Sequence, residues 1–200
     1  MPYSQFTTIT KAKDAFGLQT VEGVHFFPKI APISPSETLL NYLAESLPIA
    51  ASGSEKMRSE GIIYPILLEV RRILDKKVNL FSGEDFTVDE SLGLNGVCDF
   101  LISSSLEVLE IEAPVIIIVE AKKADLRTGI GQCVAEMVAA QRFNELRGNS
   151  KNTIYGSVTN GILWRFLKLE GQVVTLDLTD YPLPPVDEIL GFFVWMAENA

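Results

Sequence analysis

The sequence predicts a mixed α/β fold in which a mixed β-sheet is flanked by helices. Three observations carry this prediction. Apolar residues recur at helical spacing from Ile63 to Leu74, the run "VIIIV" at 115–119 is typical of a buried strand, and a long helical pattern follows it. Two hundred residues suit one domain, residues 1–200, with a sizeable core. The order of helix, three strands, helix, further strands and helix is that of a layered α/β protein.

Residues 1–35 are weakly patterned and are expected to form an N-terminal extension, with a short helix near 8–16. Ser36 is placed as the N-cap of a helix that runs to about Leu47. The stretch 54–74 predicts a longer helix or a helix pair. Pro65 should kink or restart that helix, because proline cannot donate to the carbonyl four residues back.

The rest of the chain alternates strands with helices. The glycine at 148 marks the C-terminal end of the strongest helix pattern, and Asn160-Gly161 and Glu170-Gly171 mark turns between strands. The expected elements are strands at 81–88, 97–103 and 114–121, a helix at 126–148, strands at 153–159, 162–169 and 172–178, and a helix at 186–198.

Composition excludes several classes of protein. No apolar run approaches the roughly 20 residues of a membrane span, and the first residues lack an apolar signal core. A cytoplasmic protein without a membrane partner is therefore expected. Two cysteines are most simply reduced thiols, and the one histidine, His25, leaves little room for a zinc site. The net charge of −9 argues against passive coating of nucleic acid.

Charge is unevenly distributed along the chain. Residues 78–120 contain nine acids and no lysine or arginine, whereas residues 122–151 contain six cations and three acids. The boundary between the two segments falls at "VIIIVEAKK", where a core strand ends in charge.

Three acids and a lysine stand at unusual positions. Side chains alternate faces along a strand, so Glu120 and Lys122 project together from the end of the "VIIIV" strand. Asp99 lies among apolar residues of the preceding strand, where an unpaired carboxylate would be costly. Antiparallel pairing of the two strands would set Asp99 beside Glu120. Glu60 continues an apolar stripe at a helix start.

This constellation suits metal-dependent hydrolysis of phosphodiesters. Mg²⁺ and Mn²⁺ take oxygen ligands, and Mg²⁺ commonly binds one or two carboxylates together with substrate phosphates. Such an ion polarises a phosphoryl group and lowers the pKa of bound water. A neighbouring lysine could orient the water or stabilise developing charge on the phosphate.

The chain resembles the PD-(D/E)XK nuclease superfamily, whose fold is called restriction-endonuclease-like. Asp99 matches the first acid of the signature, and Glu120-Ala-Lys122 matches its second half. Glu60 matches an acid of the first core helix, and Gln132 matches a polar position on the helix after the motif. "VTNGILWRFLKL" is similar to a strand pair in the N-terminal nuclease domains of type I restriction subunits. The resemblance covers residues 54–170, and it departs from the signature where Cys98 replaces proline.

The resemblance implies a Mg²⁺-dependent endodeoxyribonuclease, with Mn²⁺ as a substitute metal. Asp99, Glu120 and Glu60 would hold the metal, Lys122 would assist hydrolysis, and Gln132 would support the site. The implied partners are nucleic acid, in the first place DNA, and a specificity partner protein. Backbone phosphates are contacted by cations, and the candidates are Lys123, Arg127, Arg142 and Lys151.

Each motif also has a structural interpretation. An E-x-K at a strand end can be a surface ion pair, and Glu60 can be a solvated first-turn acid, with Glu69 as a rival on the next face. A catalytically silent nuclease fold, used for binding nucleic acid or protein, is the alternative function. The apolar width of the last helix, 186–198, fits either a homodimer surface or a deeply buried helix.

Overall fold

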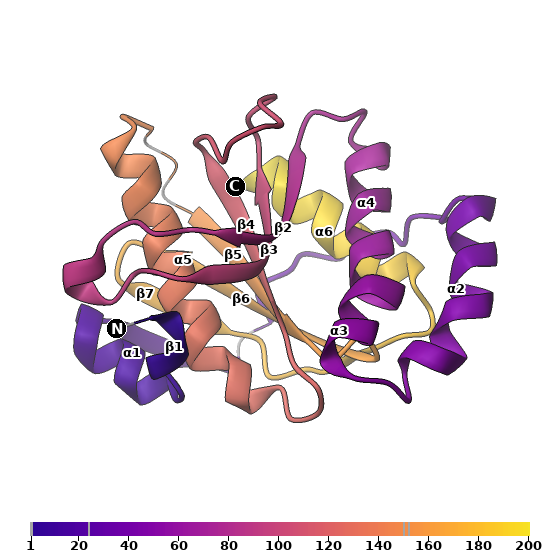
Figure 1. Cartoon of the computed structure of the whole chain (residues 1–200), viewed down its shortest axis with the longest axis horizontal. Helices are drawn as coiled ribbons and strands as arrows, with labels where there is room; N and C mark the ends of the chain where they lie inside the picture. Colours follow the sequence, from indigo (N-terminus) through magenta and orange to yellow (C-terminus); the bar gives the residue numbers. More distant parts are fainter. Residues whose placement is uncertain (1, 24, 150, 152) are drawn as a thin grey trace.

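A mixed eight-stranded sheet runs through the part of the chain described by this computed structural model, residues 2–23, 25–149, 151 and 153–200 (Figure 1). Its order is β1-β7-β6-β5-β4-β3-β2, and β8 pairs with β6 beside this path. The pairs β1–β7 and β4–β5 are parallel, and the other pairs are antiparallel. The strands are β1 (Gln19–Glu22), β2 (Asn79–Asp85), β3 (Val97–Ser103), β4 (Val115–Ala121), β5 (Thr153–Thr159), β6 (Leu163–Glu170), β7 (Val173–Leu176) and β8 (Tyr181–Pro182).

Helices cover both faces of the sheet, so the mixed α/β architecture expected from the sequence is confirmed. Figure 1 shows α1 and α5 on one side of the sheet, and α4 and α6 on the other, with α2 outside them. One apolar core lies under α5 and a second lies under α4 and α6. The helices are α1 (Ile9–Phe16), α2 (Glu37–Ala50), α3 (Glu55–Arg58), α4 (Tyr64–Ile73), α5 (Arg127–Leu146) and α6 (Asp187–Asn199).

Strand β4 lies inside the sheet between β3 and β5, and all seven of its residues are buried. Val119 and Ala121 belong to the core under α4 and α6, whereas Ile118 belongs to the core under α5. Because successive side chains alternate faces, Glu120 projects towards α5 together with Ile118. A strand covered on both sides explains the unbroken apolar run of the sequence.

Local signals placed most helix ends correctly. Ser36 caps α2 by accepting the Leu39 N–H at 3.2 Å, and Gly148 follows α5 with a φ of +70°. Pro65 lies at the start of α4, directly after a π-helical segment (Ser59–Ile63), and the backbone stays helical through the junction. The Tyr64 N–H there bonds to the Ser59 carbonyl, so the irregular turn predicted at Pro65 takes the form of a π-helical turn before it.

The N-terminal residues are part of the folded body and do not form a separate extension. Strand β1 adds to the sheet by parallel pairing with β7. Tyr3 and Phe6 are buried in the core under α5, and the Tyr3 hydroxyl donates to the Phe86 carbonyl. The sequence concealed β1 because the strand has four mostly exposed residues and finds its partner more than 150 positions later.

The last helix is apolar because it is buried within its own chain. Ile189, Leu190, Phe193 and Met196 of α6 are fully buried in the core that α6 shares with α4. Burial within the chain therefore accounts for the apolar width that a homodimer surface would also have explained. No helix of the described residues is long and apolar enough to cross a membrane.

The buried amide of Asn144 joins α5 to β4. Its Nδ2 donates to the Val115 carbonyl at 2.7 Å, and its Oδ1 accepts the Val115 N–H at 2.8 Å. The ladder between β4 and β5 begins only at Ile117, so Asn144 serves both backbone groups of Val115 where no strand does. Unpaired buried backbone groups are costly.

We expect Asn144→Ala to lower the free energy of unfolding by about 2–4 kcal/mol, because it leaves a buried N–H and a buried carbonyl without partners. Urea denaturation measures the change. Glu145→Ala, which alters the neighbouring exposed position of α5, is the control and should change stability by less than about 0.5 kcal/mol. Equal losses in the two variants would contradict this role for Asn144.

Candidate active site

The structure brings Asp99 and Glu120 together at the ends of β3 and β4. The antiparallel register pairs Phe100 with Val119, and one step further along it Asp99 lies opposite Glu120. The Asp99 Oδ2 accepts the Ala121 N–H at 2.8 Å. Opposed side chains of an antiparallel pair share one face of the sheet. The two carboxylates therefore lie on the face covered by α5.

Glu120 is fully buried, and only one of its oxygens has a partner among the described residues. Oε1 forms an ion pair with the Lys122 ammonium, whose side chain is 20% exposed. Oε2 accepts no hydrogen bond within the described chain, and a proton on Glu120 can be donated in a hydrogen bond to the Asp99 carboxylate. Such an orphaned carboxylate oxygen is rare in a folded protein, and it marks the position where a ligand or ion would be stabilised.

Backbone and helix contacts fix the position of Lys122. Its N–H donates to the Thr159 carbonyl at 2.8 Å, which continues the β4–β5 pairing by one residue. Its side chain then runs along the start of α5, where Gly129 gives it room. A Cβ at Gly129 would lie 3.0 Å from the Lys122 Cγ and 2.8 Å from the Val158 Cγ1. A larger residue at 129 would therefore push the lysine or the helix away.

Electrostatics at this site are dominated by burial and by like charges. Burial raises the pKa of Glu120 to about 8, and the negative charge of Asp99 adds to the shift. Burial also raises the pKa of Asp99, although the Ala121 N–H opposes it. Burial by itself would lower the pKa of Lys122, but the charge and hydrogen bond of Glu120 and the charge of Asp99 raise it overall. Lys122 is therefore an ammonium at neutral pH.

Glu55 is an acid of the site that the sequence did not single out. Its charge raises the pKa values of Asp99, Glu120 and Lys122. Glu55 begins α3, and Arg58 of the same helix donates to the Asn160 carbonyl at 2.8 Å. The Asn160 side chain also donates to the Ala124 carbonyl at 3.0 Å. The β5–β6 turn thus holds α3 next to the segment that follows β4.

The structure does not bring Glu60 into this cluster. Its side chain is 67% exposed and lies 3.5 Å from the Lys56 ammonium, beside Tyr42 and Tyr64. The sequence prediction assigned Glu60 to the apolar stripe of Ile63 and Leu67 by regular helical spacing. The π-helical segment has wider turns, so Glu60 leaves the apolar stripe to which the spacing assigned it. Nothing in this placement supports Glu60 as a metal ligand.

Glu69, the rival acid, is committed to structure. Its carboxylate accepts the Ser36 N–H at 2.8 Å and the Arg72 Nε–H at 2.9 Å, which ties α4 to the N-terminus of α2. The Arg72 hydrogen bond lowers the pKa of Glu69 to about 2. Both oxygens of the Glu69 carboxylate are therefore engaged in structural hydrogen bonds.

Gln132 lies on α5 together with a buried acid that the sequence analysis passed over. Its Nε2 donates to the Glu136 Oε1 at 3.1 Å. Glu136 is fully buried, and burial together with the charge of Glu120 raises its pKa well above the ordinary value. The available signal was an acid within the apolar run "CVAEMVAA" of a helix.

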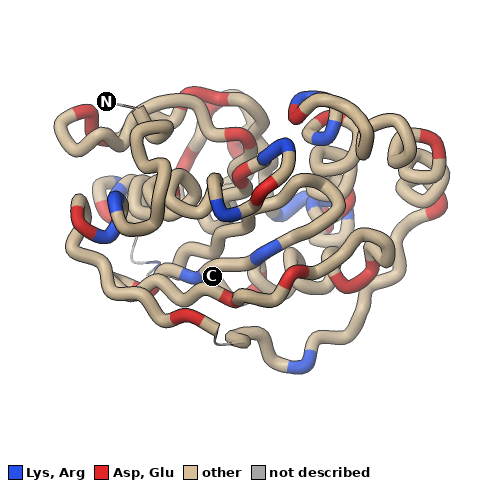
Figure 2. Tube along the Cα trace, turned by 90° about the horizontal axis from the view of Figure 1, so that it is seen from below, with Lys and Arg blue, Asp and Glu red and all other residues tan. Residues whose placement is uncertain are grey.

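The four candidate phosphate contacts differ in their surroundings. Lys123 is exposed directly after β4. Arg127 pairs with Asp125 at 2.8 Å, Arg142 pairs with Asp89 at 2.7 Å, and Lys151 donates to the Ala200 carbonyl. Figure 2 shows cationic and acidic segments interleaved along the trace, without a long cationic stripe. Three of the four cations thus already have partners within the chain.

The donors at the site fit a hard divalent cation held by few protein ligands. Asp99 and Glu120 supply carboxylate oxygens, and the buried Glu120 Oε2 has no competing partner. No group of three or more His, Cys, Asp or Glu residues within the described part of the chain is arranged to hold a metal. An ion here would complete its shell with water and phosphate oxygens, as Mg²⁺ commonly does.

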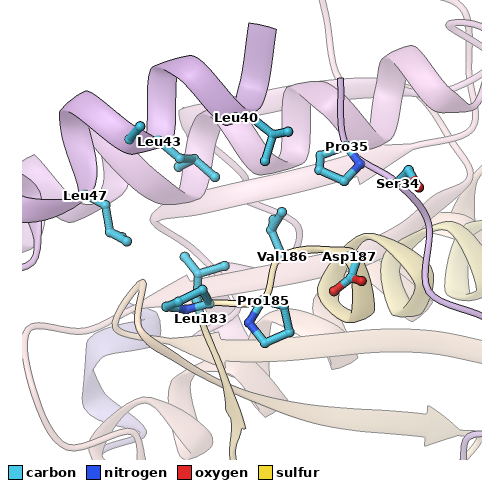
Figure 3. A pocket seen from close by; sticks show the side chains of 11 residues that line it. Ser34, Pro35, Leu40, Leu43, Leu47, Leu183, Pro185, Val186 and Asp187 are labelled. Atoms are coloured by element: carbon cyan, nitrogen blue, oxygen red, sulfur yellow. The ribbon is translucent and has the colours of Figure 1, made fainter. Parts of the chain in front are cut away.

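An apolar hollow of about 570 Å³ lies elsewhere, between α2 and the segment before α6 (Figure 3). Leu40, Leu43 and Leu47 face Leu183 and Pro185 across it (Figure 3). Asp187 is the one titratable residue of its lining within the described chain. The hollow therefore lacks the convergent polar groups that accompany a catalytic site.

Comparison of the sequence with protein-family models finds no match, and comparison with curated proteins finds none. The functional interpretation therefore depends on the geometry of the Asp99, Glu120 and Lys122 cluster and on the motifs that it contains.

The raised pKa of Glu120 predicts a pH-dependent stability with a defined sign. The folded state binds this proton more tightly than the unfolded chain, in which the pKa is about 4.3. Its stabilising contribution is complete below about pH 4 and is lost as the pH rises to about 8. Glu120→Gln, which stays neutral, should gain stability over wild type by up to about 4 kcal/mol at pH 8.

Urea unfolding in metal-free buffer at pH 5 and pH 8 measures this gain. Glu60→Gln is the matched control, because it makes the same chemical change at an exposed position and should differ from wild type equally at both pH values. A stability difference between Glu120→Gln and wild type that does not grow with pH would contradict the assigned ionisation.

Proposed function

We propose that this protein hydrolyses phosphodiester bonds, in the first place in DNA, with Mg²⁺ as its metal. The observation that carries the proposal is the buried Glu120 carboxylate, which has one oxygen on Lys122 and the other without a partner, directly beside Asp99. Keeping an acid in such surroundings lowers the stability of the folded chain. Binding of a ligand to this oxygen would be a sufficient reason for the acid to be there.

In this proposal Asp99 and Glu120 would hold the metal ion, with Mn²⁺ as a substitute. The bound ion would supply a Lewis acid and lower the pKa of a bound water. Lys122 remains an ammonium, so it donates hydrogen bonds and stabilises negative charge on the phosphate, and it does not act as a proton acceptor. Glu55, next to the cluster, would adjust the charge at the site in the role first given to Glu60.

The order of the motifs also supports the resemblance to PD-(D/E)XK nucleases. A helix with an acid, a strand with Asp99, a strand ending in Glu120-Ala-Lys122 and a helix with Gln132 follow one another along the chain. We propose on this basis that the mixed sheet is of the restriction-endonuclease-like kind. The pattern departs from the resemblance in the first acid, because Glu60 is the acid that the sequence matches and Glu55 is the helix acid whose charge acts on the cluster.

Binding of DNA would begin at Lys123 and would require neighbouring ion pairs to open. Arg127 and Arg142 could turn from Asp125 and Asp89 to phosphate, because both arginines are partly exposed. A partner protein that supplies specificity and additional positive charge suits a chain with a net charge of −9. A homodimer would need a contact surface other than the buried residues of α6.

A second candidate function is a catalytically silent module of the same fold that binds nucleic acid or protein. Two observations favour it. Cationic side chains already pair with acids of the same chain, and only two carboxylates lie close together at the proposed metal site among the described residues. In that case Glu120 would be dispensable for binding.

We expect wild-type protein to cleave DNA when Mg²⁺ or Mn²⁺ is added, and Glu120→Gln to lose both cleavage and metal binding. Lys122→Ala should bind the metal but cleave about 10²–10³-fold more slowly, because it lacks one charge-stabilising donor. Calorimetric metal titration, with cleavage of supercoiled, linear and single-stranded DNA in parallel, measures both properties. Undiminished cleavage by either variant would contradict the role assigned to that residue. A well-folded wild type that binds no metal would favour the silent module.

The two acids near the start of the first core helix give a further test. Glu55→Gln should lower kcat by about 10- to 100-fold, a size typical of residues next to a metal site. Glu60→Gln should leave kcat unchanged, because its side chain faces solvent and Lys56. Steady-state cleavage rates for the two variants decide between the geometric and the sequence assignment, and the reverse ranking would restore Glu60.

A further inference from the structure

Glu136 stands in surroundings that do not favour a carboxyl group. It is fully buried on α5, and its near neighbours along the helix, Cys133, Ala135 and Met137, are fully buried as well. Oε1 accepts one hydrogen bond from Gln132, and Oε2 is buried without a partner in the described chain. Burying a carboxyl group with a single neutral partner is unfavourable, so stability does not explain why an acid occupies this position.

Gln132 gains a defined orientation from this contact. A glutamine amide has a donating and an accepting end, and only the donating end can bond to a carboxyl oxygen that carries no proton. The Glu136 oxygen takes the Nε2 end, so the carbonyl end of Gln132 is left for a donor other than Glu136. Side chains of a helix lean towards its N-terminus. The Lys122 side chain lies against Gly129, three residues before Gln132 on the same helix.

Glu136 also adjoins the cluster of Asp99 and Glu120. The Glu120 carboxylate is the charge that acts most strongly on Glu136, followed by the charges of Asp99 and Lys122. The charges of Glu120 and Asp99 therefore act on Glu136 from the strands that α5 covers.

We propose that Glu136 is a positioning residue of the active site: it fixes the Gln132 amide so that the Gln132 carbonyl oxygen faces Lys122 and the water that attacks the phosphate. The kinetic part of this inference rests on the proposed nuclease function. The positional part concerns the folded chain alone and holds for any ligand of the site.

The chain contains its own matched control. Gln141 and Glu145 form the same Gln-x-x-x-Glu pair on α5, with the Gln141 Nε2 at 3.4 Å from the Glu145 Oε1, at an exposed position away from the cluster. Replacing Glu145 changes the same kind of contact without changing the site. Effects of Glu136 substitutions that Glu145 substitutions share are therefore not effects on the site.

The experiment compares Glu136→Leu, Glu136→Gln and Glu145→Leu with wild type in the full chain. The side-chain amide signal of Gln132 is followed by NMR, with its assignment taken from its loss in Gln132→Asn. Stability is measured by thermal unfolding, and kcat and KM are measured with Mg²⁺ and DNA. Glu136→Leu should shift the Gln132 amide signal, keep or raise Tm, and lower kcat by about 10- to 100-fold at nearly constant KM.

Glu136→Gln should restore most of the wild-type signal and rate, because its amide oxygen still accepts from Gln132. Glu145→Leu should change neither. An unchanged Gln132 signal in Glu136→Leu overturns the inference, and so does a Glu136→Gln variant as slow as Glu136→Leu. Unfolding of both Glu136→Leu and Glu136→Met, which also lacks an oxygen acceptor, would show that the acid is needed for stability and would overturn it as well.

The two failures can be told apart. If wild type cleaves no DNA, the proposed function fails, while the NMR signal and Tm still decide whether Glu136 positions Gln132. If wild type cleaves and the Glu136 variants behave like Glu145→Leu, the proposed function stands and the positioning role fails.

Discussion

The rest of the structure depends on one constraint, the placement of a carboxylate at the end of a fully buried strand. β4 is covered by α5 on one face and by α4 and α6 on the other, so the Glu120 side chain is fully buried. A buried ion costs several kcal/mol unless it is paired. Asp99, Glu120 and Glu136 share these surroundings, and the nearby Lys122 ammonium offsets only one negative charge. Either protons or a bound cation must neutralise the remaining negative charge, and the chemical properties of the site depend on which of them does so.

The fold holds this unfavourable group in place by rigid contacts around it. Gly129 allows α5 to approach Lys122, and Asn144 fastens the far end of the same helix to the start of β4. On the opposite side, Arg58 and Asn160 join α3 to the turn that follows β5. These contacts are distributed over four separate segments of the chain. A site supported in this way can keep unpaired oxygens in position, because the segments that carry it are held by contacts outside the cluster.

Most of the fold could be predicted from the sequence because its signals are local. Alternation and apolar runs located β3 and β4 almost to the residue, and Ser36 and Gly148 marked helix ends. What failed depended on distant or irregular structure. β1 needs β7 to be a strand at all, and the π-helical segment displaced Glu60 from a stripe that regular spacing assigned to it. Glu55 and Glu136 were missed because only the tertiary fold shows which acids face Glu120.

The uneven charge of the sequence has a different meaning once the fold is known. The acidic segment 78–120 and the basic segment 122–151 face each other, and they pair through Arg142–Asp89, Arg147–Glu112 and Lys122–Glu120. Much of the positive charge that suggested contacts with phosphate is therefore used within the chain. Any nucleic acid that binds must replace these pairs, which reduces the net gain from each phosphate contact. Affinity would then come mainly from the metal site and from a partner, and only to a small extent from a cationic surface, which agrees with a chain whose net charge is −9.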